Sequence, residues 1–239
     1  MKYRAEALHV LRRVVAPGLI VYLILVGCGL LITRPLRGLI AGEDDINRSF
    51  AEHRTHDWNI ATHLMSMASD TTTVVPLLVV LALLLRWIFR RWAEAVTLIS
   101  AVALQETVFL LVVFVIHRQR PDVPHLDPAP PTSSFPSGHA GAAVALYGTL
   151  AVIVGWRMRN GVLKAALLTV LLCLPFLVGA SRLYRGMHHP SDVLFGVANG
   201  IVWIAIAVHA FLPTTGQPQP LQQRVVRPRV PDDDDRVDA

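Results

Sequence analysis

The chain alternates long apolar runs with shorter polar connections. Six runs are long enough to cross the roughly 30 Å hydrocarbon core of a bilayer, which takes about 20 helical residues. They cover residues 16–33, 72–89, 93–116, 138–156, 162–180 and 193–212. Because a segment surrounded by lipid must satisfy its own backbone hydrogen bonds, each run is predicted to be a transmembrane helix.

A polar segment, residues 42–70, separates the first two apolar runs. Within it Ile46, Phe50, Trp58 and Leu64 recur at loosely helical intervals among charged residues. This pattern predicts helices that lie at the boundary between lipid and water, with the Trp58 ring at headgroup depth. Such helices are either a solvated connector or a lid over a site.

The composition is that of an integral membrane protein. Of 239 residues, 53% are hydrophobic and only 16% are charged, and the mean hydropathy is +0.48, whereas about 25% of residues are charged in a typical soluble domain. We expect one all-α domain over residues 16–212, a polytopic membrane bundle of six transmembrane helices with an interfacial helical segment between the first two. Residues 1–15 are predicted to be a cytoplasmic N-terminus. Residues 213–239, rich in Pro, Gln, Arg and Asp without periodicity, are predicted to be a disordered cytoplasmic tail.

The charge distribution bears on partners and orientation. The formal net charge of +5 comes from residues spread over loops and termini rather than gathered on one face, so no nucleic-acid partner is expected. Most of the 22 Lys and Arg residues lie near the N-terminus, around the second and fourth connections and after the last run. The positive-inside rule therefore predicts a plasma-membrane protein with both termini in the cytoplasm.

The two cysteines, Cys28 and Cys173, lie within apolar runs and match neither a disulfide framework nor a metal site. The tetrapeptide LVGC at residues 25–28 resembles a lipoprotein cleavage signal. The apolar run continues through Ile32, however, as an uncleaved span would. We therefore expect the first run to stay as a helix.

Three polar clusters reach the same outer face under this topology. They are HRQRP at residues 117–121, FPSGHA at 135–140 and SRLYRGMHHPSD at 181–192. In the third cluster Pro190 is suited to open a helix. His188 and Asp192 are four residues apart, so on a helix they share one face, where a carboxylate can fix the tautomer of a reactive imidazole. The alternative is that Asp192 simply caps the sixth helix.

The second cluster combines a helix start with an imidazole. Ser137 is a natural N-cap, Gly138 allows close approach, and the free amides of the first turn favour an anion such as phosphate. His139 is a candidate general acid, a role typically worth about 10² to 10⁴ in rate. The alternative is a capped helix with an interfacial histidine.

The arginines of the first and third clusters add positive charge at the same face. The guanidinium groups of Arg120 and Arg182 match phosphate oxygens. Arg118 and Arg185 are either further phosphate contacts or anchors for lipid headgroups. By residue type alone, zinc ligands could come from His188, His189, Asp192 and His139. The arginine-rich surroundings disfavour a metal, so we expect none.

Taken together, these residues resemble the type 2 phosphatidic acid phosphatase family, the membrane branch of a superfamily shared with vanadium haloperoxidases. The resemblance rests on R-P at Arg120 and Pro121, on P-S-G-H from Pro136 to His139, and on S-R-x5-H-x3-D from Ser181 to Asp192, and it covers roughly residues 60–212. One departure is that the family's first motif, K-x6-R-P, has Val113 at its lysine position. Arg118 is the candidate substitute.

The resemblance implies a lipid phosphatase that needs no metal or cofactor and works through a phosphohistidine intermediate. His188 would be the nucleophile, oriented by Asp192, and His139 the proton donor to the leaving group. The equatorial phosphate oxygens would be held by Arg120, Arg182, Ser137 and the Gly138 amide. The implied substrate is a lipid phosphate or lipid diphosphate of the phosphatidate, phosphatidylglycerol phosphate or polyprenyl diphosphate type, met at the extracytoplasmic membrane surface, with membrane lipids as the only other partners.

Two other functions remain open from the residues alone. Val113 is also consistent with a weakened relative that binds a phosphate lipid without turnover. Glu106, an acid within the third run, is either a functional group, such as the proton relay of a coupled transporter, or a buried structural group.

Overall fold

The computed structural model describes residues 11–36, 38, 40, 42–129, 131–159 and 161–212. The predicted tail and residues 1–10 of the predicted N-terminal segment lie outside the described residues. Within the described ranges the protein is helical, and six spans are long and apolar enough to cross a membrane. The all-α, six-span prediction is confirmed.

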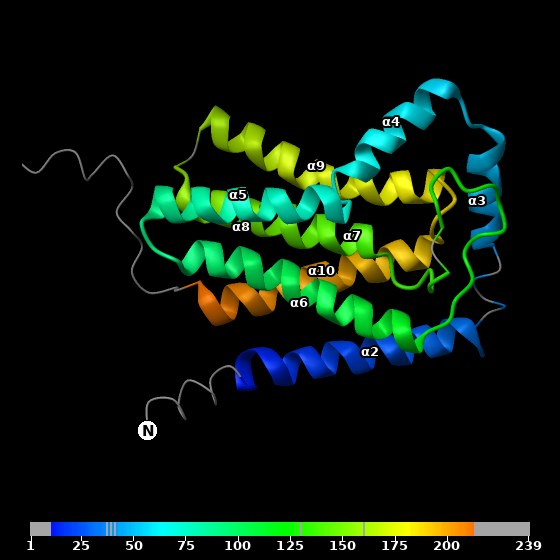
Figure 1. Ribbon diagram of the computed structural model, residues 1–239, viewed down its shortest axis with the longest axis horizontal. Coiled ribbons are helices and arrows are strands. Elements are labelled where there is room, and N and C mark those ends of the chain that lie inside the picture. Colours follow the sequence, from blue (N-terminus) through cyan, green and yellow to red (C-terminus); the bar gives the residue numbers. More distant parts are fainter. Residues whose placement is uncertain are drawn as a thin grey trace, which may run out of the picture.

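The six spans run side by side (Figure 1). They are α2 (Ala16–Thr33) preceded by the π-helical turn η1 (Leu11–Val15), α5 (Thr71–Phe89), α6 (Ala93–Val115), the composite of α7 (Gly138–Ala143), η2 (Val144–Gly148) and α8 (Thr149–Arg157), α9 (Val162–Tyr184), and α10 (Pro190–Phe211). The largest differences from the predicted runs are that the first span is already helical at Leu11 and that the fifth continues to Tyr184. Cys28 lies inside the unbroken α2.

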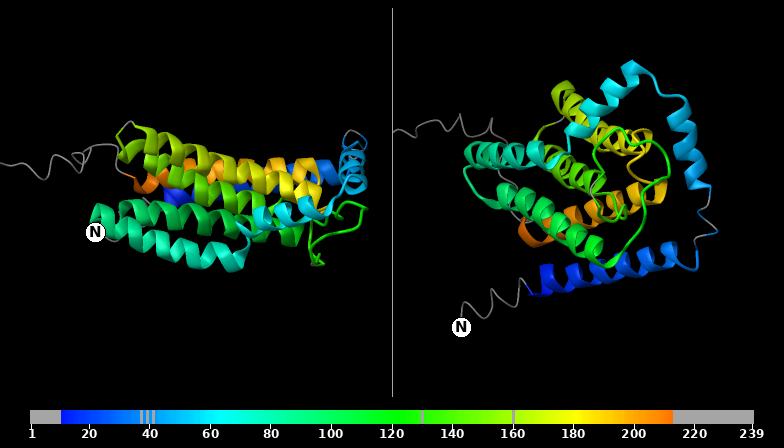
Figure 2. Two further views of the ribbon diagram at one scale, coloured as in Figure 1. Left: turned by 90° about the horizontal axis from the view of Figure 1, so that it is seen from above. Right: turned by 45° about the vertical axis from the view of Figure 1, so that its right-hand side comes forward.

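The segment between the first two spans forms two helices, α3 (Glu43–Glu52) and α4 (His56–Met67). α3 lies across one end of the bundle (Figure 2). The Thr55 side chain accepts a hydrogen bond from the Trp58 backbone N–H at 3.3 Å and so caps the start of α4. Ile46, Phe50 and Trp58 are exposed, as expected for helices at a lipid interface.

The composite fourth span is the centre of the bundle. In its apolar stretch 67% of the residues are buried inside the protein, whereas the share is 11–33% in the other five spans. Small residues allow this close packing: a side chain on Gly148 would meet Ile204 at 2.6 Å, and one on Gly200 would meet Val144 at 2.7 Å. The outer spans expose large apolar side chains such as Leu19, Phe114 and Phe176, which suits contact with lipid.

The two ends of the bundle differ in character. At one end Arg13 donates to the His209 carbonyl oxygen at 3.4 Å, which brings the outermost turns of the first and last spans together. The opposite end carries α3, α4 and the long connection between α6 and α7 (Figure 1). The three polar clusters lie at this second end.

Candidate active site

Backbone hydrogen bonds join the connection between α6 and α7 to the chain around the start of α10. The Ser137 N–H donates to the Asp192 carbonyl oxygen at 2.9 Å, and the Leu126 N–H donates to the Arg185 carbonyl oxygen at 3.1 Å. The chain leaves α9 through Gly186, whose φ of +73° is a conformation that favours glycine. Pro190 then begins α10. These backbone hydrogen bonds hold together segments that are distant in sequence.

The clusters enclose a cavity of about 440 Å³. Its lining includes Arg120, His139, Arg182 and His188, together with the acidic residues Asp70, Glu106 and Asp127. The structure therefore brings together both predicted catalytic histidines and both arginines of the recognised motifs. Gly138 also lines the cavity, at the first turn of α7.

His188 is held as a neutral imidazole with a defined tautomer. Its Nδ1 lies 2.7 Å from the Ser134 carbonyl oxygen. Because a carbonyl only accepts hydrogen bonds, Nδ1 must carry the proton, which leaves the lone pair on Nε2. Burial lowers the pKa of His188 well below its ordinary value, and the charge of Arg182 adds to this effect against the opposing Asp192 carboxylate. The neutral form is the nucleophilic one.

Both cavity arginines keep unused hydrogen-bond donors. Arg120 donates through Nη1 to the Met187 carbonyl oxygen at 2.7 Å, and Arg182 donates through Nη1 to the Ser66 hydroxyl at 2.6 Å. The Nε atoms of both arginines are buried and have no partner among the described residues. Buried donors without partners are costly, so this arrangement fits an anion that the two guanidinium groups would share.

A second arginine stands behind Arg182. Asp127 accepts from Arg182 Nη1 and Arg185 Nε, both at 2.8 Å, and from Arg185 Nη2 at 2.5 Å. Burial alone would raise the pKa of Asp127, but the hydrogen bonds and charges of these arginines outweigh it, and the pKa lies below its ordinary value. Arg185 also donates to the Asn59 carbonyl oxygen on α4 at 3.0 Å. Arg185 is therefore buried and links the connection between α6 and α7 to α4 through hydrogen bonds, so it is not an anchor for lipid headgroups.

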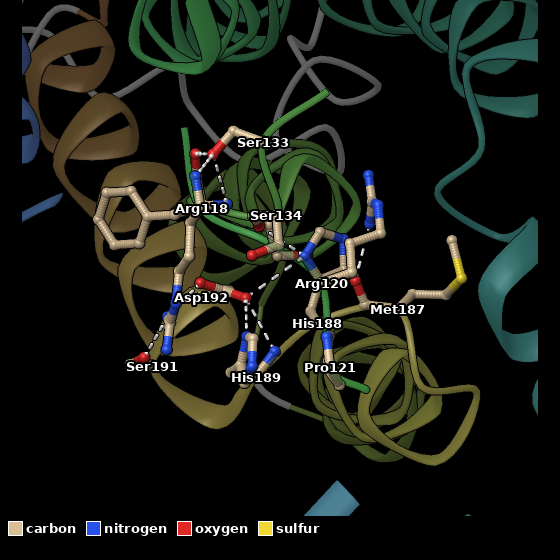
Figure 3. Close-up of polar contacts among 12 residues, drawn as sticks. Arg118, Arg120, Pro121, Ser133, Ser134, Met187, His188, His189, Ser191 and Asp192 are labelled. Atoms are coloured by element: carbon tan, nitrogen blue, oxygen red, sulfur yellow. Dashed lines mark hydrogen bonds and ion pairs between the residues drawn. The ribbon is translucent and has the colours of Figure 1, made fainter. Parts of the chain in front are cut away.

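Asp192 does not make the direct contact with His188 that the sequence predicted. Its carboxylate is 3.9 Å from His188 Nδ1, too far for a hydrogen bond. It accepts instead from the His189 backbone N–H at 2.8 Å, from His189 Nδ1 at 3.1 Å and from Arg118 Nη1 at 2.5 Å. Figure 3 shows the carboxylate between Arg118 and His189, with Arg120 on the other side of His188. The hydrogen bonds thus make Asp192 a helix cap, and the Ser134 carbonyl fixes the His188 tautomer.

Arg118 does not line the cavity. Two carboxylates hold it elsewhere, since it pairs with Asp192 and also donates through Nη2 to Glu43 at 2.7 Å. Ser137 is also fully buried outside the cavity lining, where its Oγ accepts from the Ala140 N–H at 3.4 Å as the N-cap of α7. Neither side chain therefore occupies the phosphate-contacting place that the sequence predicted, and Val113 is likewise absent from the lining.

Helix α3 supports the site from outside. Glu43 accepts from the Ser191 backbone N–H at 2.7 Å, at the exposed amide end of α10. Asn47 is fully buried and donates to the His188 carbonyl oxygen at 3.1 Å, and Asp44 accepts from His189 Nε2 at 3.1 Å. The sequence pattern predicted either a lid or a solvated connector for this segment. Its polar residues in fact fix the backbone that carries His188.

Sequence reasoning missed Ser134, Asp127, Glu43 and Asn47 as supporting residues. The clearest available signal was the EDDIN run at the start of a predicted interfacial helix, where several polar groups lie on consecutive positions. Nothing in the spacing linked that run to residues 188–192.

Comparison with known proteins identifies a family whose matched region includes the three polar clusters. A family model described as the PAP2 superfamily matches residues 94–215. The fold is similar to that of the first transmembrane PAP2 type phosphatidylglycerolphosphate phosphatase from Bacillus subtilis, with a TM-score of 0.66 and 21% identity, covering 80% of this chain and 92% of that chain. It is also similar to LpxE from Aquifex aeolicus, with a TM-score of 0.56 and 24% identity, covering 69% of this chain and 93% of that chain. No significant match exists among the curated proteins.

Proposed function

This chain belongs to the PAP2 superfamily, and from that premise we propose that it is an integral membrane phosphatase that removes the terminal phosphate of a lipid. The observation that carries the proposal is the cavity at one end of the bundle, where His188 and His139 meet Arg120 and Arg182. A neutral nucleophile, a second imidazole and two guanidinium groups with unused donors are a set suited to phosphoryl transfer.

In the first step the Nε2 lone pair of His188 attacks phosphorus, and the bond from phosphorus to the lipid oxygen breaks. The imidazolium form of His139 gives its proton to that oxygen and becomes neutral, so a monoester releases its lipid as a neutral alcohol and a diphosphate releases a lipid monophosphate. Arg120 and Arg182 stabilise the negative charge on the equatorial oxygens. The Gly138 backbone N–H, at the start of α7 in the cavity lining, is a further candidate donor to the phosphate, and a side chain at this position would meet the Phe109 ring at 2.7 Å.

In the second step water attacks the phosphohistidine. His139 takes a proton from this water, the bond between His188 and phosphorus breaks, and inorganic phosphate leaves. Asp192 acts in this scheme through its charge and through the helix start that it caps, because its carboxylate has no hydrogen bond to His188. It is a positioning residue rather than a direct partner of the nucleophile.

The membrane setting supports a lipid substrate met at the extracytoplasmic surface. Arg13, Arg91 and Arg157 lie near the ends of spans that face away from the cavity, and the positive-inside rule assigns such an end to the cytoplasm. The site would then face the outer leaflet, where a headgroup can enter the cavity while the acyl or prenyl tails stay in the bilayer.

The proposal predicts phosphate release that does not depend on added metal. Purified full-length protein in detergent micelles is supplied with phosphatidate, phosphatidylglycerol phosphate or a polyprenyl diphosphate, and inorganic phosphate is measured with and without EDTA. We expect turnover of at least one lipid, changed less than about twofold by the chelator, because the guanidinium groups supply the positive charge that a metal otherwise provides.

Binding without release separates the proposal from the alternative of a phosphate-lipid binding protein. If all three lipids bind to the micellar protein and none releases phosphate, the phosphatase proposal is wrong. Loss of activity in EDTA that returns with a divalent cation would contradict the metal-independent mechanism.

The lowered pKa of His188 predicts the acid side of the pH profile. A histidine whose pKa lies below its ordinary value of 6.5 stays neutral as the pH falls through 6.5, so kcat/KM should keep its His188-dependent part below that pH. The measurement uses two lipid phosphates whose phosphate groups have different pKa values. A fall in kcat/KM caused by ionisation of the substrate then occurs at a different pH for each lipid, whereas a fall caused by ionisation of the enzyme occurs at the same pH for both. If kcat/KM for both lipids falls on the acid side with the same midpoint near pH 6.5, the lowered pKa of His188 is contradicted.

A further inference from the structure

Side chains from two other parts of the chain hold the Arg182 guanidinium group at the wall of the cavity. Its Nη1 donates to the Ser66 hydroxyl at 2.6 Å and to the Asp127 carboxylate at 2.8 Å. Ser66 belongs to α4, and Asp127 belongs to the connection between α6 and α7. Both contacts use the same nitrogen, so the Nε donor, which has no partner in the described part of the chain, stays available to a ligand.

Asp127 is held in turn by Arg185. This second arginine donates to the carboxylate through Nε at 2.8 Å and through Nη2 at 2.5 Å, a two-point contact that fixes the orientation of the carboxylate. Arg185 is itself anchored, because it also donates to the carbonyl oxygens of Asn59 and Leu126, both at 3.0 Å. The side chains of both arginines are only 5% exposed and that of Asp127 is 17% exposed, so solvent screens these contacts weakly.

The charges of this group leave Arg182 able to bind an anion. Burial acts to raise the pKa of Asp127, but the hydrogen bonds and charges of Arg185 and Arg182 outweigh burial and lower the pKa, so the carboxylate is ionised at neutral pH. One negative charge is thus shared between two guanidinium groups, and the three side chains together keep a net positive charge. Asp127 therefore orients Arg182 without neutralising it fully.

We propose that Asp127 is a positioning residue, which holds the Arg182 guanidinium group ready to bind the phosphate. The inference rests on the proposed phosphatase function. A long arginine side chain has many rotamers, and fixing it before the ligand arrives lowers the entropy cost of binding. A nearby carboxylate also repels an anion. We expect positioning to be the larger effect, because Arg185 already offsets the charge of Asp127.

The test measures binding of inorganic phosphate to the full-length protein in maltoside micelles by ³¹P NMR titration, which gives both Kd and the number of sites per protein. Asp127→Asn is expected to raise Kd by about tenfold with an unchanged number of sites. An amide oxygen can accept from one of the two arginines, but the NH₂ group is then turned toward the other, so Arg182 loses its fixed position.

Two results with Asp127→Asn overturn the inference. If Asp127 is only a charge that repels anions, its neutralisation lowers Kd. If Asp127 only stabilises the fold, the variant has fewer sites per protein and the remaining sites keep the wild-type Kd.

Asp122→Asn is the matched control, because it removes one negative charge from an exposed position in the same connection and does not line the cavity. Its Kd should equal that of the wild type. Ser66→Ala tests whether the effect passes through Arg182, the one residue whose side chain contacts both Ser66 and Asp127 among the described hydrogen bonds. It changes no charge and should raise Kd about three- to tenfold, and an unchanged Kd contradicts the proposed route.

Asp127→Glu keeps the inference testable if Asp127→Asn does not fold. Glutamate retains the negative charge between the arginines but moves the carboxylate by one methylene, so Kd should rise by about threefold or more. A Kd equal to that of the wild type would mean that charge alone matters, and the positioning role would be wrong.

The outcome for Asp127 is separate from the outcome for the proposed function. Phosphate binding that depends on Asp127 in a protein that releases no phosphate from any lipid rejects the phosphatase and leaves the positioning role standing. Lipid turnover together with a Kd unaffected by Asp127→Asn rejects the positioning role and leaves the phosphatase standing. A wild-type protein that binds no phosphate rejects the positioning role as well.

Discussion

His188→Asn is expected to lower kcat for phosphate release by at least about 10⁴-fold, because it removes the nucleophile of the proposed reaction. Asparagine is the most informative replacement at this position. Its side-chain amide can still donate to the Ser134 carbonyl oxygen, as His188 Nδ1 does at 2.7 Å, but it has no counterpart of the Nε2 lone pair. The connection that forms the site should therefore survive while the chemistry is lost.

The neighbouring histidine provides the matched control. His189 contacts Asp192 and Asp44 and does not line the cavity, so His189→Asn should retain turnover within about tenfold of the wild type. Acid-unstable, alkali-stable label from a ³²P-labelled lipid should appear on the wild-type protein after rapid quenching and be absent from His188→Asn. Turnover by His188→Asn at the wild-type rate would reject the phosphohistidine mechanism.

The architecture could be predicted because a chain that crosses a lipid bilayer can adopt few backbone conformations. Backbone groups in hydrocarbon must be paired within a helix, so the apolar runs translate directly into spans, and the second and third predicted runs end within one residue of α5 and α6. The fifth span was predicted too short because Ser181 and Arg182 are polar. Both are buried against the bundle, so polarity there marks a site and not the end of a helix.

The site could be predicted only in its outline. Motif residues such as His139 and His188 are recognised by local pattern, but their partners come from far along the chain. Ser134 is 54 residues from His188, Asn47 is 141 residues from it, and Glu43 is 148 residues from Ser191. Such contacts depend on where irregular connections fold back, and side-chain periodicity contains no information about that.

Arg118 shows the consequence for residue roles. In the sequence Arg118 and Arg120 lie two residues apart after the third apolar run, Arg120 as part of a recognised motif and Arg118 as a candidate substitute for the missing lysine. The folded chain separates them, because Arg120 lines the cavity while Glu43 and Asp192 bind Arg118 behind it. Contacts with two carboxylates distant in sequence thus hold Arg118 away from the cavity that Arg120 lines.

This placement predicts that Arg118→Ala damages stability more than substrate binding. The Asp192 side chain is 0% exposed and that of Glu43 is 14% exposed, so removing the guanidinium leaves two carboxylates without their cation in a nearly dry site. Breaking a buried ion pair from one side typically costs about 3–5 kcal/mol. For a chain of this size that corresponds to a fall in Tm of roughly 10 °C, measured by thermal unfolding in detergent, while KM of the remaining folded protein should change less than about threefold.

Arg48→Ala is the control. Arg48 forms an exposed ion pair with Asp45 at 2.8 Å on α3, the helix that also carries Glu43. Exposed pairs contribute about 0–1 kcal/mol, so its Tm should stay within a few degrees of the wild type, on the order of 3 °C. A phosphate-binding Arg118 would give the opposite pattern, with a large rise in KM and an unchanged Tm.

A second substitution tests the cause of the instability. Glu43→Gln in the Arg118→Ala background removes one of the two uncompensated charges, and the amide can still accept from the Ser191 N–H that Glu43 now binds at 2.7 Å. The double variant should therefore be more stable than Arg118→Ala alone, with a coupling of about 1–3 kcal/mol between the two sites. Arg118 could stabilise the protein either by neutralising the two carboxylates or by packing. Neutralising Glu43 relieves only the unpaired charge, so additive losses in the double variant would mean that Arg118 contributes through packing.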